Sequence, residues 1–244
     1  MSPHVYFLKI IRRESREQME IIRLEAVKKV YQTGDIACEA LRGVSLEIEM
    51  GSFVSIVGRS GSGKSTLMHV SAGLDSVTEG RVFIDGEDIS RYSEKALCNH
   101  RNKKTGFIFQ SFFLEPAYSV FDNISMPLVI AGMSPKLRRN RVAEVSEAVG
   151  IAHKLSVPSG RLSGGEKQRV AIARAIVHQP PIVFADEPCG NLDSENSGMV
   201  MDLLEQLHRM GTTVVLVTHN AEDAKRANRM IKLRDGRVES DEVC

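Results

Sequence analysis

The strongest chemical signal in the sequence is a glycine-rich stretch, Gly58-Arg59-Ser60-Gly61-Ser62-Gly63-Lys64-Ser65-Thr66. Its spacing fits G-x-x-x-x-G-K-[ST] between an apolar run at 53–57 and a helix-like segment at 67–70, which is the context of a P-loop. Glycines let successive backbone N–H groups turn toward a phosphate, and the dipole of the following helix adds positive potential there. Lys64 is expected to contact the β and γ phosphates, and the Ser65 hydroxyl to ligate Mg²⁺. The stretch therefore predicts nucleotide binding rather than an ordinary turn rich in glycine and serine.

Two acidic residues, Asp186 and Glu187, follow an apolar run at 182–185. In an open α/β sheet, ligands bind beyond the carboxyl ends of the strands, so these acids are expected to face the P-loop. Asp186 would then hold Mg²⁺ through its water shell, and Glu187 would orient or deprotonate an attacking water. An isolated pair of acids is usually an ordinary solvated strand end, but the P-loop in the same chain favours the catalytic interpretation.

A third stretch, Leu162-Ser163-Gly164-Gly165-Glu166-Lys167-Gln168-Arg169-Val170, has the pattern of a helix start. Ser163 and Glu166 are spaced as a capping box. Gly164 and Gly165 in the first turn cost the helix up to about 1 kcal/mol each, which is reasonable if bare backbone must approach a ligand. A helix N-terminus without bulky side chains predicts a second phosphate contact. It reaches the phosphate held by the P-loop only if it approaches from the opposite side.

The first part of the chain has the pattern of short strands near the P-loop. Predicted strands lie at 21–27, 44–49, 53–57 and 80–86. A turn at Gly51 is expected to join the second and third of them as a hairpin, and the fourth is expected to be part of another short hairpin. This part of the chain predicts an antiparallel sheet beside the nucleotide site.

The second part of the chain alternates strands with helices. A strand at 105–109 is followed by a helical region to about residue 160, which Pro127 and Pro135 punctuate, with Pro135 in the first turn of a helix. A helix at 163–178 stops at two prolines. Strands at 182–185 and 212–218 then alternate with helices at 194–210 and 221–227. This order predicts a parallel sheet with helices on its faces.

Taken in order, five features resemble the nucleotide-binding subunit of an ATP-binding cassette (ABC) transporter: the P-loop, Gln110 after a strand, the stretch at 162–170, Asp186-Glu187, and His219 after another strand. The resemblance covers roughly residues 19–239. It implies an α/β fold with a P-loop NTPase (RecA-like) parallel core, an antiparallel β subdomain and an inserted α-helical subdomain at about 111–162. The whole ATPase domain would span 19–244.

The resemblance implies a role for further residues. Tyr31 would stack on adenine, Gln110 would reach Mg²⁺, the attacking water and the membrane partner, and His219 would touch the γ-phosphate. Asn191-Leu192-Asp193 resembles the loop that contacts the opposite subunit. On the sequence alone, Tyr31 also fits an exposed strand tyrosine and His219 a core histidine. The implied nucleotide contacts are Tyr31, Gly58, Arg59, Ser60, Gly61, Ser62, Gly63, Lys64, Ser65, Thr66, Ser163, Gly164, Gly165 and Glu166; the implied magnesium contacts are Ser65, Gln110 and Asp186.

The same resemblance implies two protein partners. A second copy would pack head to tail, so that Ser163 and Gly165 of one copy contact the ATP that residues 58–66 of the other hold. An integral-membrane permease would receive the resulting movement, with the cassette at the cytoplasmic face of the inner or plasma membrane. The closest resemblance is to the lipoprotein-releasing and macrolide-efflux group, which includes the ATPase of a cell-division pair. Cys189 departs from the pattern, where a threonine usually follows the proline, and it brings a thiol near the expected dimer interface.

These features suggest ATP hydrolysis that drives a separate permease in export, or in extrusion of lipid, lipoprotein, peptide or drug. The alternative is a module that regulates or transmits force to a membrane complex without net transport. A cassette acting on DNA or ribosomes is disfavoured, because the sequence has neither a long coiled-coil insertion nor two cassettes in tandem.

Composition restricts the remaining possibilities. The 244 residues carry 32 Lys+Arg and 31 Asp+Glu, a net charge of +1 that gives no sign of a nucleic-acid partner. Four scattered cysteines without C-x-x-C suggest neither zinc nor disulfides. No apolar run approaches the roughly 20 residues of a membrane helix. Residues 1–18 are expected to be a poorly ordered extension, with Met19 as a possible start and a membrane-surface or partner-binding helix as the alternative.

Overall fold

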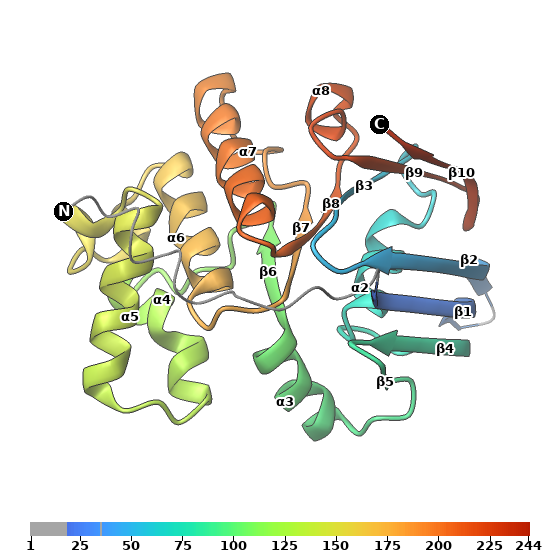
Figure 1. Cartoon of the computed structure of the whole chain (residues 1–244), viewed down its shortest axis with the longest axis horizontal. Helices are drawn as coiled ribbons and strands as arrows, with labels where there is room; N and C mark the ends of the chain where they lie inside the picture. The colour runs from blue at the N-terminus through green and yellow to red at the C-terminus, as the bar shows by residue number, and fades with distance from the viewer. Residues whose placement is uncertain (1–18, 35) are drawn as a thin grey trace.

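The computed structural model describes residues 19–34 and 36–244, which form two β-sheets with helices packed around them (Figure 1). The predicted extension at 1–18 lies outside the described residues. One sheet has the strand order β2-β1-β4-β5 and the other the order β10-β9-β3-β8-β7-β6. The predicted combination of a parallel core with an antiparallel sheet is confirmed.

The smaller sheet is antiparallel throughout. Its strands are β1 (Glu20–Thr33), β2 (Ile36–Glu49), β4 (Glu79–Ile84) and β5 (Glu87–Asp88). In β2, Leu46 and Ile48 are buried whereas Glu47 and Glu49 are exposed. This alternation is typical of a sheet that packs one face on a core and leaves the other to solvent.

The larger sheet is parallel except for its last pair, β9 and β10. Its strands are β3 (Phe53–Val57), β6 (Thr105–Phe109), β7 (Ile182–Asp186), β8 (Thr213–Val217), β9 (Arg229–Arg234) and β10 (Arg237–Val243). In β7, Val183 and Ala185 pack into one hydrophobic cluster, and Ile182 and Phe184 into another on the opposite face. Because both faces are covered, these short strands are continuously apolar rather than alternating.

The predicted hairpin between β2 and β3 is wrong. A turn with Gly51 at a φ of 76° is present, but it carries the chain from one sheet to the other. β3 pairs in parallel with β8 and β9, while β2 pairs with β1. The physical reason is burial: the apolar residues of β3 need cover on both faces, which an outer position beside the half-exposed β2 would not give.

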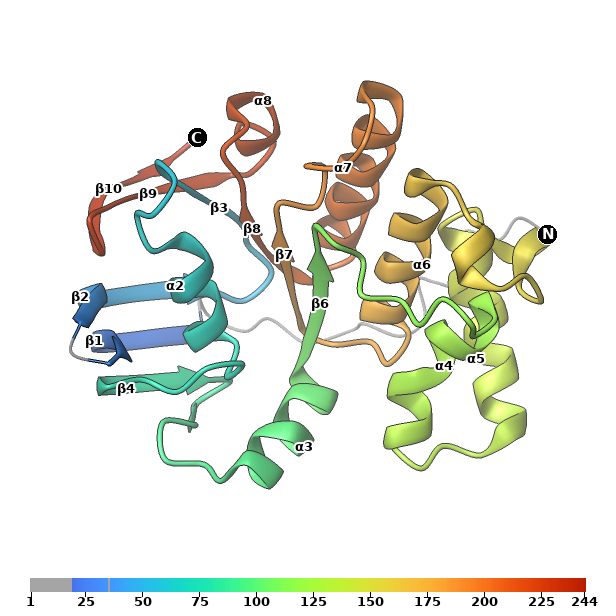
Figure 2. The ribbon, with the colours of Figure 1, turned by 180° about the vertical axis from the view of Figure 1, so that it is seen from behind.

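Helices cover both faces of the larger sheet (Figures 1 and 2). They are α2 (Lys64–Ser71), α3 (Glu94–Lys104), α4 (Val120–Ile130), α5 (Pro135–Ala148), α6 (Gly164–Ile176), α7 (Ser194–Arg209) and α8 (Ala221–Ala224). Side chains of α2 share a cluster with the antiparallel sheet, whereas α4, α5, α6 and α7 share the other cluster. No described helix is long and apolar enough to cross a membrane.

The helices between Gln110 and Ser163 include α4, α5 and two short 3-10 turns at 152–154 and 159–161. Pro135 lies in the first turn of α5, as predicted. Pro127 does not punctuate the region, because it lies inside α4, whose buried Ile124 and Leu128 hold the helix against the core. The sequence did not predict α3, since only one of its residues, His100, is buried and no apolar periodicity marks it.

Candidate functional site

The P-loop connects the carboxyl end of β3 to the first residue of α2, Lys64. Gly63 precedes the helix in the left-handed region, with a φ of 101°, and a Cβ there would lie 2.6 Å from the carbonyl oxygen of Ala40. A Cβ on Gly58 would lie 2.3 Å from the carbonyl oxygen of Leu233. Gly61, with a φ of 78°, has no atom within 4 Å of such a Cβ. Two of the glycines are therefore needed for close backbone packing and the third for its conformation alone.

Lys64 and a cavity next to the P-loop fit a phosphate-bearing ligand. The Lys64 ammonium donates to the carbonyl oxygens of Gly58 and Arg59, each at 3.0 Å, and so stays beside the loop. A cavity of about 420 Å³ lies between the P-loop and β2. The loop side is lined by Gly61, Gly63, Ser65 and Thr66, and the β2 side by Cys38, Glu39, Ala40 and Arg42. Backbone groups and a cation at the start of a helix are the donors that a phosphate prefers.

Ser65 and Asp186 form an oxygen pair next to the P-loop. The register of the parallel strands aligns Ile56, Val217 and Asp186, so their carboxyl ends lie at one edge of the sheet. The Ser65 hydroxyl donates to Asp186 Oδ1 at 3.3 Å. Burial raises the pKa of the Asp186 carboxyl. A hydroxyl and a carboxylate held together are the hard oxygen ligands that Mg²⁺ takes, so these residues fit that ion.

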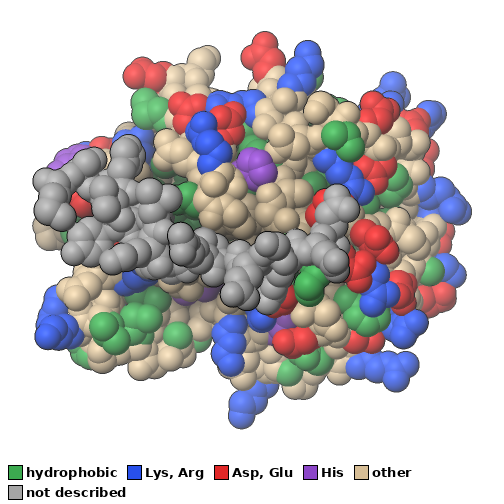
Figure 3. All heavy atoms as spheres, in the orientation of Figure 1, with side chains coloured by type: hydrophobic (Ala, Val, Ile, Leu, Met, Phe, Trp, Pro, Cys, Tyr) green, Lys and Arg blue, Asp and Glu red, His purple; other side chains and the backbone are tan. Residues whose placement is uncertain are grey.

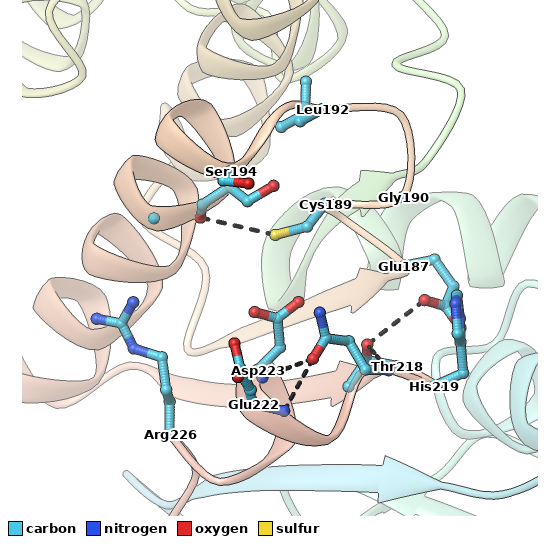
Figure 4. A pocket seen from close by; sticks show the side chains of 13 residues that line it. Glu187, Cys189, Gly190, Leu192, Ser194, Thr218, His219, Glu222, Asp223 and Arg226 are labelled. Atoms are coloured by element: carbon cyan, nitrogen blue, oxygen red, sulfur yellow. Dashed lines mark hydrogen bonds and ion pairs between the residues drawn. The ribbon is translucent and has the colours of Figure 1, made fainter.

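Glu187 and His219 form a second pair at the same edge (Figure 4). A His219 ring nitrogen, Nδ1, lies 2.8 Å from Glu187 Oε1, and the Thr218 hydroxyl donates to Oε2 at 3.4 Å. The backbone of Glu187 has a φ of 47°, and its N–H donates to the carbonyl of Val217 at 2.8 Å. A positive φ at a residue other than glycine costs conformational energy and is common at functional sites. Nδ1 donating to the carboxylate leaves Nε2 of His219 for a ligand.

Gln110 follows β6 but is tied to the loop after Glu187. Its Nε2 lies 3.5 Å from Asn191 Oδ1, and Asn191 Nδ2 donates to the Gln110 carbonyl at 2.9 Å. A Cβ on Gly190 would lie 2.6 Å from Gln110 Nε2, so this glycine gives the amide its room. The structure thus links Gln110 to the loop at 190–193, and its contacts with Mg²⁺ and water stay a prediction.

Tyr31 lies in β1 beside the cavity. It is paired across the strands with Cys38, which lines the cavity, and paired residues project from the same face. The Tyr31 hydroxyl donates to Asp75 at 2.8 Å, and Lys29 bonds the other Asp75 oxygen at 2.7 Å. The side chain is 39% exposed. These bonds hold the ring at the cavity, and its stacking on adenine stays a prediction.

The start of α6 has the predicted capping box. The Ser163 hydroxyl accepts from the Glu166 N–H at 3.4 Å, and Glu166 Oε2 accepts from the Ser163 N–H at 2.9 Å. Lys154 also bonds the Glu166 carboxylate. The Lys154 hydrogen bond, together with the Ser163 N–H, lowers the pKa of Glu166 to about 2. The carboxylate is therefore ionised and held in place at neutral pH.

Gly164 and Gly165 differ in what surrounds them. A Cβ on Gly165 would lie 1.9 Å from Asn196 Oδ1, whereas one on Gly164 would make only ordinary contacts, with Leu192 Cδ2 at 3.7 Å and the Asn191 carbonyl oxygen at 3.8 Å. Asn196 Nδ2 also donates to both carboxylate oxygens of Asp193 at 2.9 Å. Packing within the chain therefore requires a glycine at position 165. Gly164 instead leaves the backbone at the start of the helix open, as the predicted contact with a phosphate requires.

Sequence reasoning missed three residues of this region. His69 Nε2 lies 4.0 Å from Asp186 Oδ2, and its position four residues after Ser65 on α2 could have indicated it. Gln168 is fully buried and donates to the Pro188 carbonyl at 2.7 Å. Asn196 had a weak local signal only, as the third residue after the N-cap of α7.

A second cavity, of about 410 Å³, is lined in part by Glu187 and His219 (Figure 4). It is bordered by the loop at 189–192, the first turns of α7, and α8. Cys189 lies in this wall, with Sγ 3.7 Å from the carbonyl of Ser197. Burial raises the pKa of its thiol to about 12, so the reactive thiolate is scarce at neutral pH.

Comparison with known proteins identifies the family. The ABC transporter family profile matches residues 41–190. An uncharacterized ABC transporter ATP-binding protein of Thermotoga maritima is 44% identical over 220 residues, which cover 90% of this chain and 94% of the relative. The chain belongs to the ABC transporter family. It is an ATP-binding, ATP-hydrolysing cassette, as the resemblance predicted.

Two further similarities place this cassette within the family. The lipoprotein-releasing system ATP-binding protein LolD of Aquifex aeolicus is 43% identical over 219 residues, covering 90% of this chain and 96% of LolD. The macrolide export ATP-binding/permease protein MacB of Brucella melitensis is 44% identical over 221 residues, which cover 91% of this chain but 34% of MacB.

The fold is confirmed by a solved structure. That structure, described as a dimeric post-hydrolysis state of an ATP-binding cassette bound to ADP and Pi, has a TM-score of 0.85 to this chain. It is 40% identical in sequence, and the match covers 91% of this chain and 98% of that one. The predicted α/β fold of a P-loop NTPase thus holds for the ABC cassette described here.

Proposed function

We propose that this cassette hydrolyses Mg²⁺-bound ATP within a head-to-tail dimer of two copies and thereby drives a separate membrane permease. The observation that carries the proposal is the pairing of Ser65 with Asp186 and of Glu187 with His219 at one edge of the sheet. One pair supplies oxygen ligands, and the other supplies a base held by an imidazole. Both lie beside the P-loop, where the γ-phosphate of bound ATP belongs.

Each pair has a distinct chemical task in this proposal. Ser65 and Asp186 hold Mg²⁺, which neutralises charge on the phosphates. Glu187 orients the attacking water and accepts its proton, and its bond to His219 Nδ1 fixes the imidazole so that Nε2 faces the γ-phosphate. Lys64 moves from the backbone carbonyls that now hold it to the phosphates. Gln110 links the site to the permease, and its bonds to Asn191 link it to the loop that contacts the second copy.

The dimer is supported by the separation of the two predicted phosphate contacts. The start of α6 and the P-loop lie on opposite sides of β7 and β8 in both ribbon views (Figures 1 and 2). One chain therefore does not bring Ser163 to its own P-loop, but a second copy supplies the missing side. The dimeric state of the similar ADP-bound cassette is consistent with this arrangement.

The permease is supported by the names of the relatives. LolD is named as part of a lipoprotein-releasing system, and MacB joins ATP-binding and permease parts in one protein. We place this chain at the cytoplasmic face of a membrane as a peripheral subunit, in export or extrusion of a lipid, lipoprotein, peptide or drug. Tyr31 stacks on the adenine of the ATP that powers this work.

Replacing Glu187 tests the dimer and the hydrolysis together. Glu187→Gln should keep ATP binding, reduce turnover by about a hundredfold or more, and give an ATP-dependent dimer in size-exclusion chromatography with light scattering. Glu147→Gln, at an exposed position of α5, is the matched control and should hydrolyse ATP as the parent does. A Glu187→Gln protein that turns over ATP at the parent rate, or stays monomeric with bound ATP, would contradict the proposal.

A further inference from the structure

The turn between β9 and β10 packs directly against the P-loop, although some 170 residues of chain separate them. The Gly236 N–H donates to the Ser62 carbonyl at 3.0 Å, and the Gly236 carbonyl accepts from the Arg42 N–H of β2 at 2.9 Å. Asp235 and Gly236 also line the cavity beside the P-loop. The turn is therefore bonded on one side to the nucleotide loop and on the other to the antiparallel sheet.

The backbone packing around this turn leaves no room for side chains. A Cβ on Gly236 would lie 2.8 Å from the carbonyl oxygen of Ala40, and one on Gly63 would lie 2.6 Å from the same atom. A Cβ on Gly58 would meet the Leu233 carbonyl of β9 at 2.3 Å. Three glycines thus bring the P-loop, β2 and the β9–β10 hairpin together through bare backbone.

The bond to Ser62 has a direct effect on the groups that face the phosphate. The Ser62 carbonyl and the Gly63 N–H belong to one planar trans peptide, so they point in opposite directions. When the carbonyl is held outward by Gly236, the Gly63 N–H is turned to the inside of the loop. Inward N–H groups are what the loop offers a phosphate.

We propose that Gly236 is a positioning residue for nucleotide binding, through which the C-terminal hairpin sets the shape of the P-loop and hence the affinity for ATP. This inference rests on ATP binding by the P-loop. Gly236 has a φ of 74°, so a side chain there is strained and also presses on Ala40. The turn then moves off Ser62, and the Ser62–Gly63 peptide is released to rotate.

The chain contains a matched control for this proposal. Asp85-Gly86, between β4 and β5, is a second Asp-Gly turn, with φ values of 50° and 80° against 47° and 74° at Asp235-Gly236. A Cβ on Gly86 would meet nothing within 4 Å. Alanine therefore carries a similar conformational cost in both turns, but only the turn at Gly236 is bonded to the P-loop.

The test compares Gly236→Ala with Gly86→Ala in the full chain. Both should lose thermal stability through the positive φ, and Gly236→Ala should lose more because its Cβ also presses on Ala40. Isothermal titration with ADP and Mg²⁺, and with a non-hydrolysable ATP analogue, should show about tenfold weaker binding for Gly236→Ala and less than about twofold for Gly86→Ala. Equal affinities in the two variants, or the parent affinity in Gly236→Ala, would overturn the proposal.

Two further measurements keep the outcome unambiguous. Asn tolerates positive φ better than Ala, so Gly236→Asn replaces Gly236→Ala if the latter does not fold, and the same loss of affinity is expected from its Cβ. Lys64→Ala reports on the P-loop itself. If the parent chain binds no nucleotide, the proposed function fails; if the parent binds and Gly236→Ala binds equally well, only the role of the hairpin fails.

Discussion

The P-loop region and the start of α6 both present backbone N–H groups at a helix N-terminus, but their side chains are used differently. Around the P-loop, polar side chains bond across elements that are distant in sequence, as Ser65 does with Asp186 and His219 with Glu187. At the α6 start, Ser163 and Glu166 bond each other, and Glu166 also bonds Lys154. The first region thus assembles reactive groups, whereas the second fixes the form of one helix end.

This difference explains why the two regions are needed together. The groups proposed to ligate Mg²⁺ and activate water come from several strand ends, which the parallel sheet brings together at its carboxyl edge. A helix end that contacts a phosphate needs only a fixed, bare backbone. Mutations in the P-loop region are expected to change ATP binding and turnover. Mutations at the α6 start are expected to change stability and dimer formation.

Asp186→Asn should have the largest effect, and it should act in opposite directions on activity and stability. Loss of the carboxylate removes a proposed Mg²⁺ ligand, so ATP turnover should fall roughly a thousandfold. Burial raises the pKa of Asp186, so in the metal-free protein the ionised form costs stability as pH rises through that pKa. The neutral Asn avoids this cost and should raise the melting temperature.

The measurements are phosphate release and thermal unfolding without Mg²⁺. Asp122→Asn, at an exposed position of α4, is the control and should keep the parent turnover. A lower melting temperature for Asp186→Asn would show that the carboxylate stabilises the fold, and a parent rate of phosphate release would show that it does not serve the chemistry.

Lys64→Ala should weaken ATP binding by about a hundredfold, because it removes a charged hydrogen-bond donor from the phosphates. Lys167→Ala removes the same charge from the α6 start and should leave the affinity of the monomer unchanged. Titration calorimetry on both variants separates the regions. Equal losses of affinity would mean that both regions bind ATP within one chain. That result would contradict the distinction drawn between them.

The two glycines of the α6 start should respond to alanine in opposite ways. Gly164→Ala meets only ordinary contacts and improves the helix, so the free energy of unfolding should rise by up to about 1 kcal/mol. Gly165→Ala collides with Asn196, so it should fall by about 1–3 kcal/mol. Urea unfolding measures both. Gly165→Ala in an Asn196→Ala background should recover part of the loss; no recovery would mean that Asn196 is not the obstacle.

Motifs with fixed local spacing were predictable from the sequence. The P-loop and the capping box follow from residues that are close together in the sequence, and parallel strands place Asp186 and Glu187 at the correct edge of the sheet. The predicted pairing of β2 with β3 was wrong because a turn residue such as Gly51 does not show which sheet each flanking strand joins. The contacts of Gly165 with Asn196 and of Gly236 with Ser62 were not predictable, because distant parts of the chain create them.

The smallest effect is expected from the ion pair that holds the capping box. In the unfolded chain Glu166 has a pKa of 4.5, whereas in the folded chain it is about 2. A lowered carboxylate pKa gives stability that is complete above pH 4.5 and is lost as pH falls toward 2. The Lys154→Met variant loses the main cause of this shift. Its deficit in the free energy of unfolding should therefore be largest at about pH 6 and smaller at about pH 3.

Urea unfolding of the parent and Lys154→Met at the two pH values gives this difference, with Lys136→Met at an exposed position of α5 as the control. A deficit that is the same at both pH values would mean that Lys154 stabilises by packing rather than by charge. A deficit that is smaller at about pH 3 would mean that the order of the α6 start depends on the Glu166 carboxylate. ATP-dependent dimer formation should then weaken as the pH falls from 4.5 toward 2, where the Glu166 carboxylate takes up its proton.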